Sequence, residues 1–300
     1  MRIRPVIHRI IALVLASMCM LVSTGCASTT EFSDSEHIDT GIIGPRIRIG
    51  IPLDQPALSI RAGSTYSGFT VDVAQYVAKQ LGYAPWQIEW VEAQPKALEQ
   101  LFQEGNIDIA AGLFVPDSQL EQIKEQVNIL LAGAYARDDE SILAIHHQRE
   151  EEQHQDITVA QDILGKVVCT VSAEDLTKRQ WPGMTHVIQQ PSVMQCATAL
   201  MSGMADAVVA PRIALTGIAH TSLEDAVSGR NAQVLTEALD TGAYYMVVKT
   251  GANTLQSRIA LALEHMVQTG TWQEVTEHVE HSTGVRVGLP QALQQQKKDA

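Results

Sequence analysis

Cysteine is the residue type whose positions in this 300-residue chain point most directly to chemistry. Three arginines precede an apolar run over residues 10–22, and Cys26 follows that run closely. The run is shorter than the about 20 apolar residues needed to span a bilayer. A basic start and a short apolar run are typical of a secretory signal. We therefore expect residues 1–25 to be a signal peptide, with Cys26 beginning the exported protein.

The residues just before Cys26 suggest a modification of its thiol. Residues 21–26 read LVSTGC and resemble the lipobox of bacterial lipoproteins. The resemblance implies that Cys26 carries lipid on its sulfur and its amine. The alternative is an ordinary signal peptide followed by an incidental cysteine. Residues 26–45 are rich in small and acidic residues with little apolar periodicity, so we expect a flexible tether between the lipid and the folded protein.

Two further thiols remain for chemistry within the folded protein. Cys19 leaves with the signal peptide and Cys26 is assigned to lipid, so Cys169 and Cys196 remain. In an exported protein two such thiols most simply form a disulfide. Closing that loop would stabilise the fold by about 3.5 kcal/mol in the chain-entropy description. Two separate buried thiols are the alternative.

The charge of the chain excludes several partners. The net charge is −13 at pH 7, and the signal region contributes arginines without acids, so the remainder is more acidic still. An acidic surface argues against binding nucleic acid or anionic lipid by charge. After the signal region, we find no apolar run of membrane-spanning length in the sequence.

Hydrophobic periodicity predicts alternating strands and helices in both halves of the chain. In the first half we expect strands at 46–51, 88–91 and 107–111 and helices at 71–81 and 95–103. In the second half we expect strands at 166–171, 185–188, 206–209 and 243–248 and helices at 193–201 and 213–219. This order predicts parallel sheets with helices on their faces.

A short internal similarity supports two lobes. Residues 105–110 (GNIDIA) match residues 203–208 (GMADAV), each with a helix end, a glycine, two residues, an aspartate and a strand. The glycine is suited to the left-handed cap that ends the helix. We therefore predict two similar α/β lobes rather than one large sheet.

Two polar segments lie outside this pattern. Residues 146–156 contain three histidines among charged residues, and we interpret them as a solvated loop or helix face near a domain border rather than a metal site. Residues 283–300 include a Gln- and Lys-rich end, and we expect a disordered tail.

Several segments together resemble the family 3 extracytoplasmic solute-binding proteins, the amino-acid receptors of ABC importers. They are residues 66–74, 80–83, 101–108 and 269–272. Residues 54–56, the helix at 72–81, and residues 165–169 with 195–196 are similar to the glutamate-binding branch of actinobacterial type, in which the two cysteines pair. The resemblance covers residues 46–282.

The resemblance implies a type II periplasmic-binding-protein-like α/β fold with two lobes joined by two crossover strands. Lobe 1 would comprise residues 46–140 and 243–282, and lobe 2 would comprise residues 141–242. Solute would close the lobes by hinge motion, and the closed form would dock on the permease.

In open α/β sheets, ligands bind beyond the carboxyl ends of the strands. This rule selects residues 52–60, 112–118, 172–176 and 210–212. The candidate ligand-binding residues are Asp54, Leu58, Gly112, Leu113, Ser118, Glu174, Asp175 and Arg212.

The chain departs from the family at the positions that would hold an amino acid. The family's carboxylate-binding arginine falls at Ser118, and its anion cradle falls on residues 173–175, which include Glu174 and Asp175. Its aspartate for the ammonium falls on Pro211, beside Arg212. An amino acid needs a cation for its carboxylate and a carboxylate for its ammonium. The candidate pocket has lost the cation and gained acids.

Three interpretations follow for this pocket. It binds a solute with a cationic or neutral head facing Glu174 and Asp175, it binds an amino acid in reverse with Arg212 on the carboxylate, or it is vestigial within a sensor or regulatory module. Simple exposed loop charges are the alternative for these three side chains.

The function we predict is a monomeric receptor, anchored to the cell membrane by lipid, that delivers an amino acid or related small polar solute to an ABC importer. We expect no cofactor and no metal. A dehydratase-like enzyme on this fold is a weaker alternative, because paired carboxylates can perform acid–base work.

Overall fold

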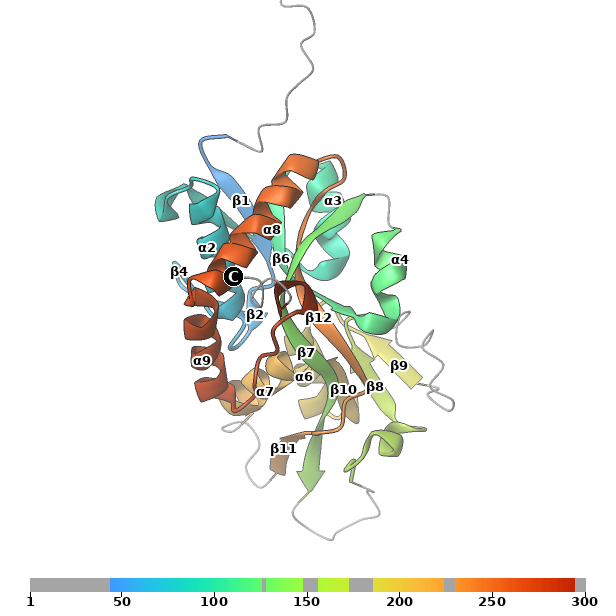
Figure 1. The fold of residues 1–300 in the computed structure, drawn as a ribbon. Helices are drawn as coiled ribbons and strands as arrows, with labels where there is room; N and C mark the ends of the chain where they lie inside the picture. Colours follow the sequence, from blue (N-terminus) through green and yellow to red (C-terminus); the bar gives the residue numbers. More distant parts are fainter. Residues whose placement is uncertain (1–43, 126–127, 148–155, 173–185, 224–229, 295–300) are drawn as a thin grey trace, which may run out of the picture. The chain divides into compact units, whose positions relative to one another are not determined.

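The computed structural model describes residues 44–125, 128–147, 156–172, 186–223 and 230–294 (Figure 1). The main sheet contains β1 (Ile47–Ile51), β5 (Ile88–Glu92), β6 (Ile109–Pro116), β7 (Ile129–His147), β8 (Val167–Thr170), β9 (His186–Gln189), β10 (Ala207–Pro211), β11 (Arg230–Val234) and β12 (Asp240–Lys249). A small sheet contains β2 (Asp54–Gln55), β3 (Ser59–Ala62) and β4 (Thr65–Ser67).

The α-helices are α2 (Phe69–Gln80), α3 (Leu98–Gln103), α4 (Leu120–Lys124), α6 (Val193–Met201), α7 (Arg212–Ile218), α8 (Asn253–Gln268) and α9 (Thr271–Thr283). Short 3-10 turns are η1 (Pro85–Gln87), η2 (Pro95–Ala97), η3 (Asp117–Gln119) and η4 (Ala160–Ile163), and η5 (Ala219–Leu223) is a π-helical turn. The predicted helix at 193–201 coincides with α6, and the other predicted elements differ from the observed ones mainly at their ends.

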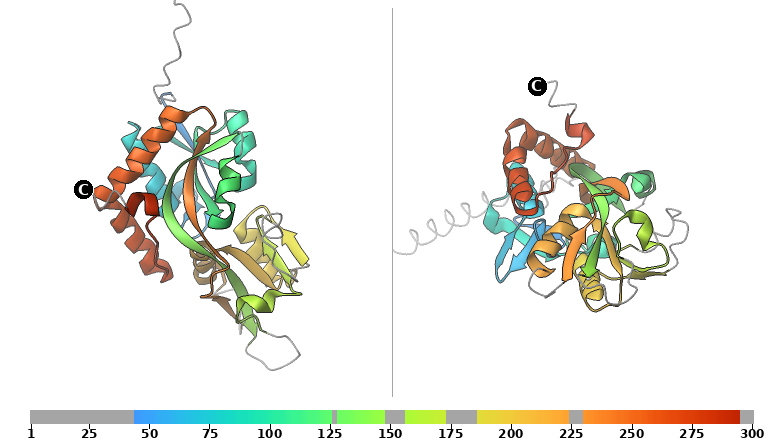
Figure 2. Two further views of the ribbon diagram at one scale, coloured as in Figure 1. Left: turned by 45° about the vertical axis from the view of Figure 1, so that its right-hand side comes forward. Right: turned by 90° about the horizontal axis from the view of Figure 1, so that it is seen from below.

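Two long strands connect the halves of the main sheet. The strand order is β5-β1-β6-β12-β7-β10-β8-β9, with β11 also paired to β7. β7 pairs with β12 from Ile129 to Glu140 and with β10 from Glu140 to Ala144. Figure 2 shows β7 and β12 running together from one half to the other. The prediction that the two lobes do not share one large sheet is therefore wrong, because the hydrogen bonds of β7 and β12 make one sheet continuous through both halves.

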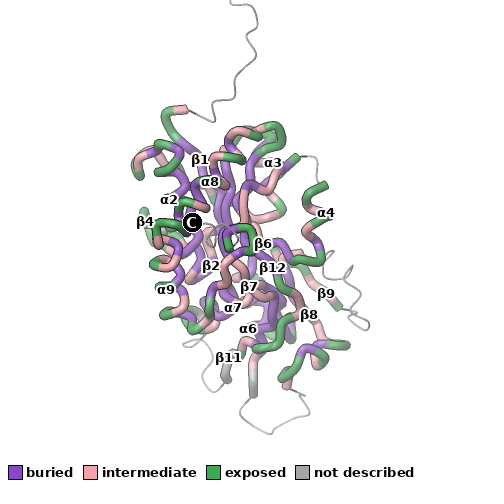
Figure 3. Tube along the Cα trace, viewed as in Figure 1, coloured by how far each residue is buried: buried purple, intermediate pink, exposed green. Residues whose placement is uncertain are grey.

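Four hydrophobic clusters among the described residues, two in each half, nevertheless define two lobes, and we call the clusters of each half its core. In the first lobe, around β1, β5 and β6, Ile109 packs with α2, α8 and α9 while the adjacent Ala110 packs with α3 on the other face. In the second lobe, around β8, β9 and β10, Val208 packs with α6 and α7 while Val209 packs with η4. Successive strand residues point to opposite faces, so each lobe has helical or 3-10 layers on both sides of its sheet. Figure 3 shows the central strands β1, β6, β8 and β10 mostly buried, whereas the edge strands β5 and β9 are partly exposed.

The internal similarity has the same hydrogen bonding in both lobes. The backbone N–H of Asp108 donates to the carbonyl of Arg48 at 2.9 Å, and the N–H of Arg48 donates to the Asp108 carboxylate at 2.8 Å. Asp206 and Val167 make the equivalent pair at 2.8 and 2.7 Å. Gly105 and Gly203 have φ of 68° and 76°, which is the predicted left-handed cap. Each aspartate fixes the start of one strand against its parallel neighbour.

The crossover strand β7 is absent from the elements predicted by periodicity. Residues 137–141 read RDDES, a polar sequence that is not typical of a buried central strand. The strand forms because β12 and β10 flank it at this point. His146 and His147 end β7, so the interpretation of residues 146–156 as a loop or helix face is wrong at its start, and residues 148–155 lie outside the described part. The predicted boundaries at 140/141 and 242/243 fall inside β7 and β12.

The predicted disordered tail is wrong for residues 283–294, since Thr283 ends α9. Gly288 and Arg137 form an isolated antiparallel bridge, with N···O distances of 2.7 and 3.1 Å. Val287 and Leu293 are buried in the first core. These apolar side chains return to the lobe that α9 covers, so the segment continues the fold. Residues 295–300 lie outside the described part.

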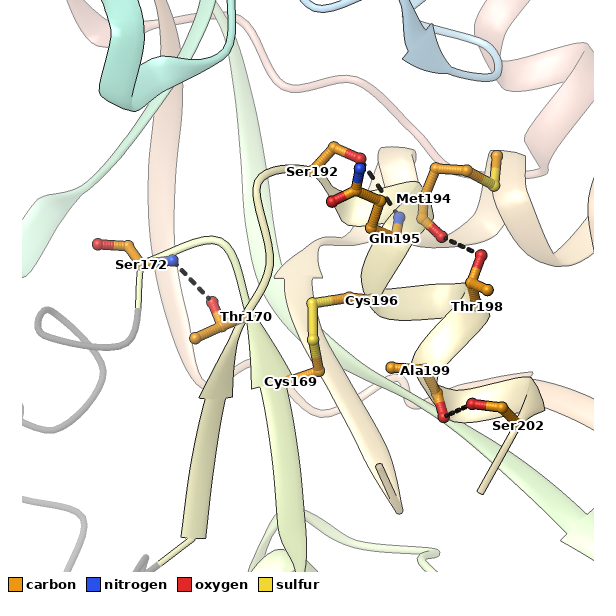
Figure 4. Close-up of a disulfide and its surroundings, with 10 residues drawn as sticks. All are labelled: Cys169, Thr170, Ser172, Ser192, Met194, Gln195, Cys196, Thr198, Ala199 and Ser202. Atoms are coloured by element: carbon orange, nitrogen blue, oxygen red, sulfur yellow. Dashed lines mark hydrogen bonds between the residues drawn. A yellow bond between two sulfur atoms is a disulfide. The ribbon is translucent and has the colours of Figure 1, made fainter. Parts of the chain in front are cut away.

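The disulfide prediction is confirmed. Cys169 of β8 is bonded to Cys196 of α6, and both side chains are fully buried (Figure 4). The alternative of two separate thiols is wrong. Ser192 caps α6, accepting a hydrogen bond from the N–H of Gln195 at 3.2 Å. The covalent bond joins α6 to the sheet that it covers.

A turn of the first lobe contacts helix α7 of the second. The carbonyl of Ala57, between β2 and β3, accepts from the N–H of Phe69 at 3.0 Å, so the start of α2 holds this turn. On its other side, a Cβ added at Gly217 of α7 would lie 2.2 Å from the Pro56 carbonyl oxygen. Ile213, one turn earlier in α7, is buried in the first lobe's core. The lobes therefore meet through backbone contact at Gly217.

A buried acid on β7 holds the start of the same helix. Asp138 is 7% exposed and accepts from the N–H of Ile213 at 3.0 Å and from the Tyr244 hydroxyl at 3.4 Å. Burial raises the pKa of Asp138 to about 7, more than the hydrogen bonds from Ile213 and Asp139 lower it. Asp138 thus links β7, β12 and α7.

Among the described residues, no helix combines the length and the apolar character that crossing a membrane requires.

We predict that Gly217→Ala destabilises the protein. Alanine normally stabilises a helix by about 0.5–1 kcal/mol relative to glycine. Here the methyl group would overlap the Pro56 carbonyl, so we expect the free energy of unfolding to fall by about 1–3 kcal/mol in urea titrations. Thr198→Ala, on the exposed side of α6, is the control and should change it little. A Gly217→Ala protein as stable as the wild type would contradict the contact.

We predict that Asp138 makes stability depend on pH. The folded-state pKa of about 7 lies above the ordinary 3.8, so the folded state holds a proton that the unfolded state has released between these values. Stability from this group therefore increases as the pH falls below 7. Relative to Asp138→Asn, the free energy of unfolding of the wild type should increase by about 2–3 kcal/mol as the pH falls from 8 to 5.

The measurement is the free energy of unfolding of both proteins across this range. Tyr244→Phe is the matched control: it removes one hydrogen bond but keeps the acid buried, so the gain should persist. If the difference in the free energy of unfolding between wild type and Asp138→Asn did not change with pH, the raised pKa of Asp138 would be contradicted.

Candidate functional site

A cavity of about 340 Å3 lies where the two lobes and the crossover strands meet. The first lobe contributes Gln55, Lys96, Glu99, Gly112, Leu113, Phe114, Pro116 and Gln119 among others. The second lobe contributes Thr170, Val171, Ser172, Val193, Val209, Ala210 and Pro211. The crossover strands contribute Glu140 and Tyr244. Pro116, Thr170 and Pro211 end β6, β8 and β10, so the cavity lies at the strand ends that the general rule selects.

Two of the predicted site residues line this cavity, namely Gly112 and Leu113. They lie within β6 rather than in the predicted loop, because β6 continues to Pro116 through pairing with β12. The β6–β12 register shifts between Tyr245 and Met246, and Gly112 is the extra residue opposite that step. Its φ is 91°, and an added Cβ would lie 2.9 Å from Pro52. A glycine bulge therefore shapes this wall.

Two other predicted residues from the first lobe are not among the cavity lining. Leu58 is 1% exposed and belongs to the first core, where its carbonyl accepts from the N–H of Thr70 at 2.8 Å. Asp54 accepts from the Gln94 side chain at 3.2 Å. The neighbouring Gln55 lines the cavity instead.

Ser118 and Arg212 are engaged with acids away from the cavity lining. The Ser118 hydroxyl donates to Asp240 at 2.5 Å. The Arg212 guanidinium forms an ion pair with Asp139 at 2.8 Å and donates to the Thr236 carbonyl at 2.7 Å. A reversed amino acid with its carboxylate on Arg212 would have to replace these partners. Glu174, Asp175 and Cys26 lie outside the described residues.

A second arginine near the crossover is also paired. Arg137 donates to both carboxylate oxygens of Asp117, at 2.8 and 2.6 Å, and Thr241 adds a hydrogen bond at 3.0 Å. The hydrogen bonds from Arg137 hold the pKa of Asp117 below its ordinary value. Paired arginine and aspartate thus fix the end of β6 against β7 and β12.

The structure adds lining residues that sequence reasoning missed. Glu140 lies on β7, a strand that periodicity did not reveal, and Tyr244 lies on β12, outside every segment selected by the strand-end rule. Lys96 lies in η2, which is also outside the segments that the strand-end rule selected. The acidic run around residue 140 is the signal that could have drawn attention to Glu140.

The wall chemistry suits a small polar solute. Glu140 is a buried carboxylate at 6% exposure, and Tyr244 is buried with its pKa raised well above the ordinary value, first by burial. Gln55, Thr170 and Ser172, which have polar side chains, also line the cavity. Within the described residues, no three His, Cys, Asp or Glu side chains gather as metal ligands would.

Known protein sequences place the chain in a family. The sequence profile of the bacterial extracellular solute-binding proteins, family 3, matches residues 47–279. Glutamate-binding protein GluB of Corynebacterium efficiens is 27% identical over 281 residues, covering 87% of this chain and 89% of GluB. GluB of Corynebacterium glutamicum is also 27% identical, over 259 residues that cover 81% of this chain and 82% of GluB.

Solved structures share the fold. An ancestral arginine-binding protein bound to arginine is 20% identical with a TM-score of 0.63, covering 79% of this chain and 99% of the other. A histidine kinase sensor domain with similarity to periplasmic binding proteins has a TM-score of 0.63 at 16% identity, covering 82% and 98%. The family profile matches residues 47–279, and the structure has two cores on shared crossover strands. This chain therefore belongs to the family 3 bacterial extracellular solute-binding proteins.

Proposed function

We propose that this protein is the receptor for a small polar, amino-acid-like solute and delivers it to the permease of an ABC importer. The observation that carries the proposal is the cavity of about 340 Å3 lined by both lobes and by both crossover strands. Its volume lies at the lower end of the about 300–1,000 Å3 typical of small-molecule sites. Similarity to the GluB proteins supports an amino-acid-like solute.

Hinged closure follows from the same arrangement. Both walls of the cavity are attached to β7 and β12, so bending of these strands would separate the walls, with α7 moving against the first core in which Ile213 is buried. In the proposed receptor, the bound solute stabilises the closed form, and the permease recognises that form.

A lipid anchor on Cys26 is part of the proposal. It is supported by the resemblance of residues 21–26 to a lipobox and by membership of an extracellular family. The anchor would hold the receptor at the outer side of the cytoplasmic membrane, where the permease lies.

A sensor or regulatory module on the same fold is the second candidate. The similarity to a histidine kinase sensor domain favours it, although at 16% identity that similarity concerns the fold alone. We propose no catalytic role, since the relatives described above are binding proteins.

We predict that a small polar solute raises the melting temperature of the protein. The full chain is purified in detergent, unfolded and refolded to remove bound solute, then heated with single amino acids, amines and small acids. A solute at 100 times its dissociation constant should stabilise the native state by about 2.7 kcal/mol. The solute should be recovered unchanged. Failure of every class to shift the melting temperature would contradict the receptor and favour the regulatory candidate.

We predict that Cys26→Ser abolishes lipid labelling of the protein. In bacteria fed radioactive palmitate, the wild type should be labelled and recovered with membranes, because the label is attached through this thiol and its amine. Cys19→Ser is the matched control, since it lies in the expected signal peptide and should leave labelling unchanged. Equal labelling of Cys26→Ser and wild type would contradict the anchor.

A further inference from the structure

The cavity wall contains a buried side-chain amide that has no partner within the described protein. Gln55 lines the cavity from β2 and is 8% exposed. In the part of the chain that the structure describes, its side-chain amide makes no hydrogen bond. Buried amides normally have partners, because giving up hydrogen bonds to water costs free energy. The partners of this amide must therefore come from the cavity, as water or as a solute.

The backbone around Gln55 is fixed on both sides. Gln55 pairs with Ser59 of β3, and its carbonyl accepts from the N–H of Leu58 at 3.1 Å. The next residue, Pro56, lies against Gly217 of α7 in the second lobe. A group on a fixed and buried segment loses less freedom when a solute binds. The position of Gln55 therefore suits selective recognition.

The second lobe contributes a hydroxyl donor to the same cavity. Thr170 ends β8, lines the cavity and is 5% exposed. Its hydroxyl oxygen accepts from the N–H of Ser172 at 3.4 Å, and among the described residues no group accepts the hydroxyl hydrogen. A solute that touches both lobes can therefore accept a hydrogen bond from Thr170 while it pairs with Gln55.

Other buried polar residues of the described wall are already engaged within the protein. Gln119 and Glu140 each take part in an interaction of their own, so we assign neither to the solute. The Tyr244 hydroxyl donates to Asp138 at 3.4 Å.

The charged residues at the edge of the wall are exposed. Lys96 and Glu99 line the cavity from η2 and α3, and both are exposed to solvent. Exposed charges interact weakly because water screens them. Among the described lining groups, Gln55 and Thr170 thus offer a solute one buried and uncharged side chain from each lobe.

We infer that the solute presents a carboxamide to Gln55, and that this contact selects it over apolar and charged counterparts. The inference rests on the proposed receptor function and specifies its solute class. A carboxamide has both an N–H donor and a carbonyl acceptor, so it can pair reciprocally with the Gln55 amide and also accept from Thr170. An apolar group would leave these hydrogen bonds unmade. A charged group would be buried beside neutral groups that supply no opposite charge.

The test compares amino acids that differ in one group, by calorimetry with the refolded full-length protein. Glutamine and asparagine carry the carboxamide on side chains of two lengths. Methionine and leucine are their apolar counterparts of similar size, and glutamate and aspartate are their acidic counterparts. The readout is the ratio of affinities for a carboxamide amino acid and for its apolar counterpart, because a purely structural change would weaken both equally.

We predict that the wild type binds glutamine or asparagine at least about thirtyfold more tightly than its apolar counterpart, as expected for two or more hydrogen bonds. In Gln55→Met, which keeps the size of the side chain, this ratio should fall at least about tenfold. Thr170→Val removes one hydroxyl and should lower the ratio about fivefold. Gln80→Met, the same substitution at the exposed end of α2, is the control and should leave the ratio unchanged.

Three results would overturn the inference. They are an unchanged ratio in Gln55→Met, a wild type that binds an apolar or acidic counterpart at least as tightly, and a wild type that binds neither glutamine nor asparagine. In each case the broader thermal screen judges the receptor function separately, since a shift with any other solute leaves it standing. If Gln55→Met does not fold, the wild-type ratio and that of Thr170→Val still decide the question.

Discussion

The pairing of β7 with β12 is the constraint on which the rest of the structure depends. These two strands pair from Ile129 to Glu140, and each also pairs with strands of a lobe. The two lobes are thereby connected through a continuous backbone ladder, and helix α7 adds a second connection because Ile213 packs in the first core and Leu215 packs in the second.

The crossover concentrates charged side chains. Residues 137–140 read RDDE, and Arg137 pairs with Asp117, Asp138 accepts from the N–H of Ile213, and Asp139 pairs with Arg212. Each contact joins a crossover strand to the end of a neighbouring strand or the start of a helix. The two arginine–aspartate pairs are partly exposed and Asp138 is buried, and together their hydrogen bonds fix the end of β6 and the start of α7 near the cavity.

The same kind of pairing involves two residues at positions where the family resemblance implies an amino-acid clamp. The position expected to hold an arginine is Ser118, bonded to Asp240, and the arginine beside Pro211 is bonded to Asp139. The described cations near the crossover stabilise the protein's own acids. On the described cavity wall, Glu140 is a buried acidic residue, and Gln55, Gln119 and Thr170 are buried polar residues.

The sequence by itself determined the elements that local physics specifies. Periodicity located α2, α6 and most strands, the glycine–aspartate repeats marked both helix-to-strand turns, and two cysteines in an exported chain indicated the bond between Cys169 and Cys196. These features depend on residues close in sequence or on thiol chemistry. The strand-end rule also selected Gly112 and Leu113, which line the cavity from within β6.

Only the tertiary structure decided the crossover and the cavity wall. β7 has a polar centre whose strand conformation comes from β10 and β12, more than 60 residues away in sequence, so no local pattern could reveal it. For the same reason Glu140 and Tyr244 were missed, while Leu58 was placed in a site although its side chain packs in the core. Local sequence sets periodicity and turns, but which polar side chain faces a cavity depends on long-range pairing.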